Sequence, residues 1–375
     1  MCFLRQPFTL TLLFLTLPPL VTIAEDEDEP APRRARPAPV VSPVFHEKNK
    51  VTFQVKAPKA TEVALAGEMT EGRVPMTKNK DGLWSITLEA VPPGIYGYGL
   101  TIDGVKMVDP GNPSLKPQRA PRTSILYVPG DKSHDFKDVP HGTVHQHDYF
   151  SDPVKRFRQL RVYTPPGYES SDESYPLLVL QHGHSDTFAT WTDHGKAHWI
   201  LDNLIAAGEA KPMIVVMLDG HPVPESFGGA LSAENAEELR IDLLETVLPM
   251  IEQKYRIKPG RENRAIAGLS MGGFHALTIG LNELDTFAWI GAFSAGIPER
   301  NAIATALDQP HQTNEQLHLL WIACGEDDFL LPRNKLAIAE LDASGITHEW
   351  VLTQGGHTWP VWRDYLARFA PRLFK

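Results

Sequence analysis

Cysteine is almost absent from this chain. Its 375 residues include only Cys2 and Cys324, and Cys2 lies in a segment that we expect to be removed, so no disulfide framework can form. Positive charge is also scarce, because 36 Lys and Arg residues face 46 Asp and Glu residues, for a formal net charge of −10. The chain therefore has no global electrostatic attraction for nucleic acid or anionic lipid. With 42% hydrophobic and 22% charged residues, the composition excludes wholesale disorder and a multi-span membrane protein.

Long hydrophobic runs are missing as well. The apolar run from Leu10 to Leu17 is too short to cross about 30 Å of hydrocarbon and is ended by two prolines. Because one positive charge, Arg5, precedes the run and small residues follow it, residues 1–24 are predicted to be a signal peptide. Its removal implies a secreted or periplasmic protein with no membrane attachment. The acidic, proline-rich stretch 25–44 is predicted to be a disordered linker.

Residues 45–130 have the pattern of a small β-sandwich. Short runs of β-forming residues alternate with clusters of turn residues. These runs are Val51–Val55, Glu62–Leu65, Leu83–Leu88 and Tyr96–Ile102. Asp103-Gly104 predicts a hairpin turn after the last run, because both positions of such a turn favour residues that tolerate a positive φ. Trp84, Tyr96 and Tyr98 could form a sugar-stacking platform, but alternating aromatics on strands usually belong to a core, which is the interpretation that we favour.

Residues 140–375 show a different pattern. Leu177–Leu180 and Met213–Leu218 are apolar without alternation, which is typical of strands covered on both faces. Thr192–Ala207 and Ala236–Tyr255 carry apolar residues at helical spacing. The alternation of strands and helices predicts a single α/β domain with a largely parallel sheet, in which chemistry gathers at the carboxyl ends of the strands.

Ser270 is the candidate nucleophile. It stands in Gly268-Leu269-Ser270-Met271-Gly272, between a strand-like segment and a helix-compatible one. A serine on a sharp strand-to-helix turn needs small neighbours, because the backbone there is tightly bent. The motif arises often by chance, so its position between strand and helix carries the prediction. The helix that follows would point its first N–H groups at a developing oxyanion.

A serine hydroxyl needs a base, and in the α/β-hydrolase order an acid and then a histidine follow the nucleophile. A strand-like segment leads into a loop with Glu326, Asp327 and Asp328, and His357 lies on the last loop before the C-terminal helix. The pattern does not choose among the three acids. We therefore predict Ser270 and His357 as catalytic residues, with one of these carboxylates as the partner of the histidine.

The second oxyanion donor should come from the loop after an early strand. His182-Gly183-His184 follows the buried strand predicted at Leu177–Leu180. Because backbone N–H groups act as donors in such a loop, we predict that the amides of His184 and Met271 form the oxyanion hole.

The histidines of this region could instead be metal ligands. Asp186 lies close to His182 and His184 in the sequence, and His194 and His198 have the i, i+4 spacing of a helical zinc motif. That motif requires a glutamate beside its first histidine, which this sequence lacks, and zinc needs three or four ligands that meet at one point. We therefore expect neither a metal nor another cofactor.

Together these residues resemble the esterase-D-like branch of the α/β-hydrolases. The likeness is to carbohydrate esterase family 1, which includes feruloyl and acetylxylan esterases and is similar to enterochelin esterases. The matching segments are Arg161–Tyr168, Leu180–Gly183, Pro212–Gly220, Arg264–Gly273, Cys324–Phe329 and Gly355–Trp359. In that family the acid ends a Gly-x-x-Asp pattern, so the resemblance implies Asp328 as the third member of a Ser-His-Asp triad.

Residues 45–130 resemble the immunoglobulin-like early-set domains that precede the catalytic domains of carbohydrate-active enzymes. The likeness rests on Gly82-Leu83-Trp84, Pro93–Tyr98 and Ile102-Asp103-Gly104. The resemblance thus implies an α/β-hydrolase domain preceded by a small all-β domain.

The resemblance further implies a serine esterase that cleaves feruloyl or acetyl esters on plant-type polysaccharides or oligosaccharides. Trp191 and Trp359 are candidate substrate-binding residues, because an indole can stack on a sugar or a phenolic ring. Packing within the core is an equally good interpretation of these two residues. Three alternatives stay open: a siderophore lactone esterase of the enterochelin type, a mycolyl-type acyltransferase, and a carbohydrate-binding protein with an inactive hydrolase domain. No nucleic acid partner is expected, and the sequence does not fix the oligomeric state.

Overall fold

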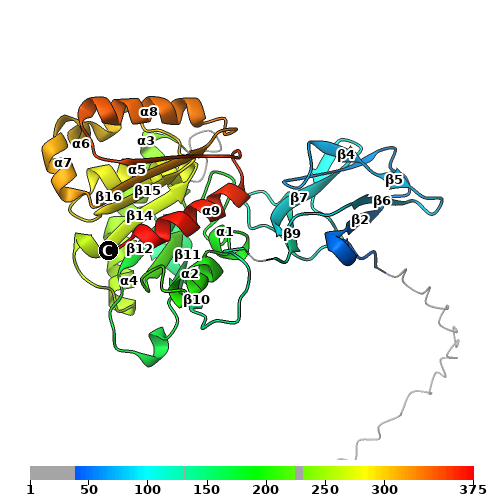
Figure 1. Ribbon diagram of the computed structural model, residues 1–375, viewed down its shortest axis with the longest axis horizontal. Coiled ribbons are helices and arrows are strands. Elements are labelled where there is room, and N and C mark those ends of the chain that lie inside the picture. The colour runs from blue at the N-terminus through cyan, green and yellow to red at the C-terminus, as the bar shows by residue number, and fades with distance from the viewer. Residues whose placement is uncertain (1–38, 131, 224–230) are drawn as a thin grey trace, which may run out of the picture. The chain divides into compact units, whose positions relative to one another are not determined.

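Figure 1 shows the computed structural model of the chain, which describes residues 39–130, 132–223 and 231–375. The predicted leader at 1–24 and most of the predicted linker at 25–44 lie outside these ranges. The described residues form three β-sheets and the helices that pack on the largest of them. None of the helices in these ranges combines the length and the apolarity needed to cross a membrane.

Two small sheets make up the first part of the fold. One has the order β1-β2-β6-β5, and the other has the order β4-β3-β7-β8 with β9 paired to β7. The strands are β1 (Val44–Phe45), β2 (Val51–Lys56), β3 (Val63–Gly67), β4 (Arg73–Pro75), β5 (Thr77–Lys78), β6 (Leu83–Leu88), β7 (Gly94–Ile102), β8 (Val105–Met107) and β9 (Ser124–Val128). Alternate residues of β2 are buried in a core that also takes residues from β3, β7 and β9, as expected for strands with one face on a core. This arrangement confirms the predicted β-sandwich.

The aromatic residues of the sandwich lie mainly in its core. Trp84 and Tyr98 are 7% and 2% exposed, and the Tyr98 hydroxyl donates to Asp109 at 2.8 Å. The platform interpretation is therefore wrong for these two rings. The predicted hairpin turn is confirmed, because Asp103 and Gly104 between β7 and β8 have φ values of 47° and 85°.

The large sheet is mixed and has eight strands in the order β10-β11-β13-β12-β14-β15-β16-β17. Its strands are β10 (Thr143–Ser151), β11 (Arg156–Thr164), β12 (Leu177–Gln181), β13 (Ile214–Leu218), β14 (Arg264–Leu269), β15 (Trp289–Phe293), β16 (Leu319–Gly325) and β17 (Glu349–Thr353). Strand β11 is antiparallel to both of its neighbours, whereas all pairings from β13 to β17 are parallel. The carboxyl ends of the parallel strands therefore lie at one edge of the sheet.

Helices cover both faces of this sheet (Figure 1). They are α1 (Thr190–Asp193), α2 (Ala197–Ala206), α3 (Ala233–Asp242), α4 (Leu248–Lys254), α5 (Met271–Asn282), α6 (Ala304–Asp308), α7 (Pro310–Gln316), α8 (Leu331–Ser344) and α9 (Trp359–Phe369). Short 3-10 helices occur at η1 (Glu47–Asn49), η2 (Tyr168–Ser170), η4 (Arg261–Asn263), η5 (Arg300–Ile303) and η6 (Ala370–Arg372), and η3 (Leu243–Val247) is a π-helix.

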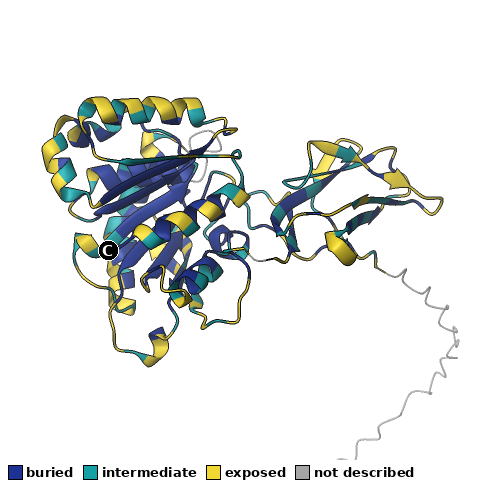
Figure 2. Ribbon diagram, viewed as in Figure 1, coloured by how far each residue is buried: buried dark blue, intermediate teal, exposed yellow. Residues whose placement is uncertain are grey.

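The two faces of the sheet belong to separate cores. Leu177 and Val179 of β12 pack with residues of α3, α4 and α5, whereas Leu178 and Leu180 of the same strand pack with residues of α2 and α9. Figure 2 shows the central strands buried throughout and the exposed residues on the outer sides of the helices. Burial on both faces explains why these strands are apolar without alternation. The predicted α/β-hydrolase architecture is confirmed.

Neither of the two predicted helices is a single regular α-helix in the structure. The segment predicted at Ala236–Tyr255 is helical from α3 through η3 to α4, and the π-helix comes just before Pro249, which lacks the N–H of a regular helical hydrogen bond. The prediction of one helix at Thr192–Ala207 is wrong. The chain breaks between α1 and α2, where Lys196 has a φ of 56° and a Cβ on Gly195 would lie 2.6 Å from the Trp359 ring.

Polar contacts join the sandwich to the α/β domain within the compact unit formed by residues 40–375. Arg363 of α9 is 1% exposed, and its guanidinium donates to the carbonyls of Ile95 and His194, each at 2.8 Å. The ion pair between Lys116 and Asp186 is also buried, with 2.8 Å between Nζ and Oδ1. Removing one partner from such a pair leaves a buried charge without a partner and lowers the free energy of unfolding by about 3–5 kcal/mol. These contacts therefore hold the two parts together.

Candidate active site

Ser270 occupies the sharp turn between β14 and α5. Its φ of 54° and ψ of −112° are unusual for a residue with a side chain, and such strain costs about 1–3 kcal/mol. The surrounding backbone holds the turn in place, because the Ser270 N–H donates to the Phe293 carbonyl at 2.8 Å and the Gly296 N–H donates to the Ser270 carbonyl at 2.9 Å. Strained backbone of this kind is characteristic of functional sites.

The two glycines of the motif are required by close packing around this turn. A Cβ on Gly268 would lie 2.5 Å from the carbonyl carbon of Gly272, and a Cβ on Gly272 would lie 2.6 Å from the carbonyl oxygens of Gln181 and His182. Backbone atoms cannot yield as a flexible side chain can. The spacing Gly-x-Ser-x-Gly therefore follows from the approach of α5 to β12 and β14.

The structure brings Ser270, His357 and Asp328 together. His357 Nε2 lies 3.0 Å from Ser270 Oγ, and His357 Nδ1 lies 2.9 Å from Asp328 Oδ2 and 3.0 Å from Oδ1. Because a carboxylate can only accept, Nδ1 carries the proton and Nε2 is left as an acceptor for the serine hydroxyl. The ring of His357 is held between Phe329 and Trp362, at centroid distances of 4.5 and 4.9 Å.

Asp328 is the acid that faces the histidine. It is 3% exposed, whereas Glu326 and Asp327 are exposed to solvent. Burial alone would raise the pKa of Asp328, but the hydrogen bond from His357 and the one from the Leu330 N–H outweigh it and hold the pKa below its usual value. The carboxylate thus stays charged next to the imidazole.

The loop of residues 182–186, called here the 182–186 loop, lies against the serine. A Cβ on Gly183 would be 3.6 Å from the Ser270 Cβ. His182 Nδ1 donates to the Gly183 carbonyl at 2.8 Å, and His182 Nε2 accepts from the Gly220 N–H at 2.9 Å. His182 therefore ties this loop to the segment that follows β13, and the two amides predicted as oxyanion donors, those of His184 and Met271, belong to segments that flank Ser270.

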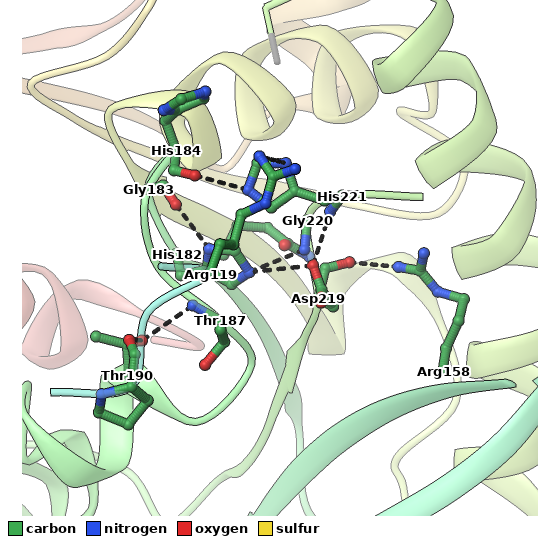
Figure 3. Close-up of polar contacts among 12 residues, drawn as sticks. Arg119, Arg158, His182, Gly183, His184, Thr187, Thr190, Asp219, Gly220 and His221 are labelled. Carbon is green, nitrogen blue, oxygen red and sulfur yellow. Dashed lines mark hydrogen bonds and ion pairs between the residues drawn. The ribbon is translucent and has the colours of Figure 1, made fainter. Parts of the chain in front are cut away.

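His221 and Arg119 support the same loop from outside (Figure 3). His221 Nε2 donates to the His184 carbonyl at 2.8 Å, and Arg119 donates to His221 Nδ1 at 3.4 Å. Burial lowers the pKa of His221 to about 3, and the positive charge of Arg119 acts in the same direction. His221 is therefore a neutral ring with its proton on Nε2, and its hydrogen bond fixes the direction of the peptide group between His184 and Ser185.

The sandwich also contributes an acidic group near the histidine loop. Glu68 Oε1 accepts from the N–H of Trp359 at 3.2 Å, and Glu68 Oε2 accepts from the Gly97 N–H at 2.6 Å. Trp359 is the first residue of α9 and lies two residues after His357. A carboxylate at a helix N-terminus satisfies a free N–H and is favoured by the helix dipole.

The predicted substrate-binding role of Trp191 and Trp359 is wrong. The two residues are 1% and 2% exposed, their rings meet edge to face at 5.0 Å, and Trp191 Nε1 donates to the Gln181 carbonyl at 2.9 Å. Neither ring has a free face for a sugar or a phenol. They belong to the core beneath the site, where they pack against each other and support the loops above.

The histidines considered as metal ligands have other surroundings. His194 is fully buried with its ring 5.2 Å from that of Trp359, and burial holds its pKa well below the usual value. In the ranges that the structure describes, no three His, Cys, Asp or Glu side chains are grouped to hold a metal ion. Cys324, the cysteine within these ranges, is a free and buried thiol.

Sequence reasoning missed His221, Arg119 and Glu68. His221 had a signal, because it lies in the loop that follows a predicted strand of the parallel sheet, where functional groups gather. Arg119 and Glu68 had none, because their partners lie 102 and 291 residues away in the chain.

Comparisons with known proteins identify the families to which the two parts of the chain belong. A model of the Esterase family matches residues 151–373, and a model of carbohydrate-binding module 48, the isoamylase N-terminal domain, matches residues 41–113. The chain belongs to the esterase family. The early-set resemblance of the N-terminal part is likewise confirmed at the level of its domain family.

Relatives with assigned activities cover different shares of the chain. An endo-1,4-β-xylanase/feruloyl esterase of Xylanibacter ruminicola is 33% identical over 346 residues, which is 89% of this chain but 46% of the relative. An acetyl esterase of Caldicellulosiruptor saccharolyticus is 28% identical over 233 residues, 52% of this chain and 82% of the relative. The chain thus spans less than half of the bifunctional xylanase relative.

Solved structures show the same fold. A ferulic acid esterase superposes with a TM-score of 0.57 at 28% identity and covers 63% of this chain and 99% of its own. The enterobactin esterase of Shigella flexneri superposes with a TM-score of 0.65 at 17% identity and covers 86% of this chain and 92% of its own. The second likeness extends over the sandwich as well as the α/β domain and concerns the fold alone.

Proposed function

We propose that the protein is a serine esterase that removes feruloyl or acetyl groups from carbohydrates. The observation that carries the proposal is the hydrogen-bonded series of Ser270, His357 and buried Asp328 on the strained turn after β14. An activated serine of this kind attacks carbonyl carbon, and the esterase family supplies the class of bond.

The mechanism follows from the contacts around His357. Its Nε2 takes the proton of Ser270 as Oγ attacks the ester carbonyl, and Asp328 orients the ring and stabilises the imidazolium that forms. The protonated ring then gives its proton to the departing alcohol, which leaves an acyl group on Ser270. Water, deprotonated by the same nitrogen, attacks this acyl-enzyme and releases the acid.

The oxyanion formed in each step needs donors that are already in place. The amides of His184 and Met271 are the candidates, because one belongs to the loop next to Ser270 and the other begins α5 directly after it. Fixed donors of this kind contribute about 3–4 kcal/mol each to lowering the barrier. The hydrogen bond from His182 Nδ1 to the Gly183 carbonyl supports this arrangement, because that carbonyl and the His184 N–H belong to the same peptide group.

The acyl group and the alcohol are inferred from the relatives. Feruloyl and acetyl esterases appear among proteins that match the α/β domain, and the sandwich matches a carbohydrate-binding module. A carbohydrate ester is therefore the favoured substrate class. Secretion is part of the proposal, on the basis of the leader predicted at residues 1–24; sequencing the N-terminus of the protein recovered from the culture medium or periplasm tests it.

A panel of esters tests the substrate. We expect hydrolysis of methyl ferulate or acetylated xylan by the purified protein and no measurable rate with Ser270→Ala, whose fold is checked by circular dichroism. Cleavage of a catecholate trilactone in preference to both would instead establish a siderophore esterase. Transfer of the acyl group to an added sugar faster than hydrolysis would establish an acyltransferase, and no turnover of any ester would contradict an enzyme.

A further inference from the structure

A cavity of about 430 Å³ lies next to the 182–186 loop. Its walls come from the sandwich, mainly from β7 and its neighbours, and from the segment 118–123 that connects the sandwich to the α/β domain. Ser185 of the 182–186 loop also lines it. The cavity therefore touches both the N-terminal domain and the loop that holds a predicted oxyanion donor.

The charged side chains that line this cavity all have one sign. They are Arg73, Lys106, Arg119 and Arg122, and no acidic residue is found among the lining residues that the structure describes. Arg73, Lys106 and Arg122 are exposed and have no ion-pair partner in the described ranges. A protein with a formal net charge of −10 has here a local patch of opposite sign, and facing cations repel one another unless an anion lies between them.

Two acidic groups close in sequence to lining residues are already engaged. Asp186 forms the buried ion pair with Lys116, and Glu68 accepts from the backbone N–H groups of Trp359 and Gly97. Neither carboxylate is therefore available to neutralise the cavity. The charges of Arg73, Lys106 and Arg122 therefore have no carboxylate partner within the part of the chain that the structure describes.

The segment that carries Arg119 is fixed to the 182–186 loop. The Arg119 N–H donates to the Ser185 carbonyl at 3.0 Å, and its guanidinium reaches His221, which bonds the His184 carbonyl (Figure 3). A group bound in the cavity would thus lie beside the residues that flank Ser270. The position suits a remote part of a substrate whose ester is at the serine, and it does not suit the ester itself.

We propose that this cavity binds the carboxylate of an acidic sugar unit, a uronic acid, carried by the esterified carbohydrate. The inference rests on the proposed function, because it names a feature of the same substrate. Guanidinium groups match a carboxylate through paired N–H donors, and the side chains of Gln118, Thr123 and Ser185 offer hydrogen bonds for sugar hydroxyls. The cations also offset the repulsion that an acidic sugar meets from the rest of this anionic protein.

The test measures binding without turnover. Isothermal titration of the full-length protein uses two xylo-oligosaccharides without ester groups, identical except that one carries a glucuronic acid branch. We expect tighter binding of the branched acid, with an advantage that shrinks as sodium chloride is raised from 0.05 to 0.5 M, because screening weakens exposed charge pairs. Arg73→Gln/Arg122→Gln should weaken binding of the acidic oligosaccharide by about tenfold and leave the neutral one unchanged.

A matched double variant controls for net charge. Lys59 and Lys80 are exposed on the same domain and do not line the cavity, so Lys59→Gln/Lys80→Gln removes the same charge and should leave both affinities unchanged. Equal binding of the acidic and neutral oligosaccharides would overturn the proposal. So would equal loss in both double variants, competition by sodium sulfate as effective as by glucuronate, or a ferric catecholate bound in place of the uronic acid.

A failure of the uronic acid proposal can be distinguished from a failure of the esterase proposal. Methyl ferulate has no sugar unit to place in the cavity, so the Arg73→Gln/Arg122→Gln variant should hydrolyse it at the wild-type rate. Absence of hydrolysis of every ester in the panel by the wild-type protein would contradict the esterase proposal, whereas equal oligosaccharide affinities would contradict the uronic acid proposal alone.

Discussion

Replacing Asp328 with asparagine tests whether this residue, and not Glu326 or Asp327, is the catalytic acid of the 326–328 loop. The Asp328 carboxylate is 3% exposed and has both oxygens within 3.0 Å of His357 Nδ1. An asparagine of the same shape can turn an NH₂ group toward the ring, which favours the tautomer with the proton on Nε2. That nitrogen could then no longer accept the proton of Ser270.

The size of the effect can be stated in advance. Loss of the charge that stabilises the imidazolium, together with the wrong tautomer, should lower kcat by about 10³- to 10⁴-fold, which corresponds to about 4–5.5 kcal/mol. KM should change little, because Asp328 is buried behind His357 and does not face the substrate. Initial rates on methyl ferulate at saturating and limiting concentrations measure both constants.

Two neighbouring variants serve as controls. Glu326 and Asp327 are exposed, so Glu326→Gln and Asp327→Asn should keep kcat within about twofold of the wild-type value. A loss of the same size in Asp327→Asn, or an Asp328→Asn variant that keeps a tenth of the wild-type kcat while folded, would refute the assignment. Urea unfolding of each variant shows whether a loss of activity reflects a loss of structure.

Three further predictions concern the supports of the site. His221→Phe removes the donor to the His184 carbonyl and should lower kcat by about 10- to 100-fold at nearly constant KM. The variant His221→Gln should recover part of this activity. An unchanged kcat would show that His221 does not support the 182–186 loop. Trp191→Ala opens a cavity under that loop and should lower the free energy of unfolding by about 3–5 kcal/mol, as measured by urea denaturation. An unchanged free energy of unfolding together with a raised KM would instead indicate that Trp191 binds substrate. Burial lowers the pKa of His275 from 6.5 to about 3, so below pH 6.5 this residue takes up a proton in the unfolded chain but stays neutral in the native state. Its contribution should lower the free energy of unfolding by about 2 kcal/mol between pH 8 and pH 5. A free energy of unfolding that rises on acidification would contradict this prediction.

The elements of the fold could be predicted where the chain repeats a simple pattern. Leu177–Leu180 became β12 and Met213–Leu218 includes β13, because strands buried on both faces have to be apolar at every position. Asp103-Gly104 became a turn because its φ values require such residues. The break before α2 escaped prediction, since it depends on the contact between Gly195 and the Trp359 ring, which comes from the far end of the chain.

The serine and the histidine of the site could be predicted for a related reason. Both follow strands of a parallel sheet, whose carboxyl ends meet at one edge, so the order of the segments already places them near each other. The choice of Asp328 came from a family resemblance, because spacing alone cannot show which of three adjacent carboxyl groups turns inward. The role of Trp191 could not be decided from the sequence, because a large aromatic residue near a site is equally suited to a core and to ligand binding, and only its burial decides.

The sandwich is closer to the site than its separate sequence pattern suggested. Glu68 caps the helix that follows His357, and Arg119 bonds both Ser185 and His221. Each of these contacts reaches a loop next to Ser270. The N-terminal domain is thus part of the structure that holds the site, in addition to any part that it has in binding carbohydrate.

The central claim is that Ser270 is the nucleophile, and covalent labelling tests it most directly. A fluorophosphonate ester reacts with a serine that a histidine has activated and stays attached. Mass spectrometry of the labelled and digested protein should find one phosphonyl group per chain, on the peptide that contains Ser270, and none in His357→Ala or Ser270→Ala. Labelling at another residue, or hydrolysis of methyl ferulate by Ser270→Ala at the wild-type rate, would contradict the account.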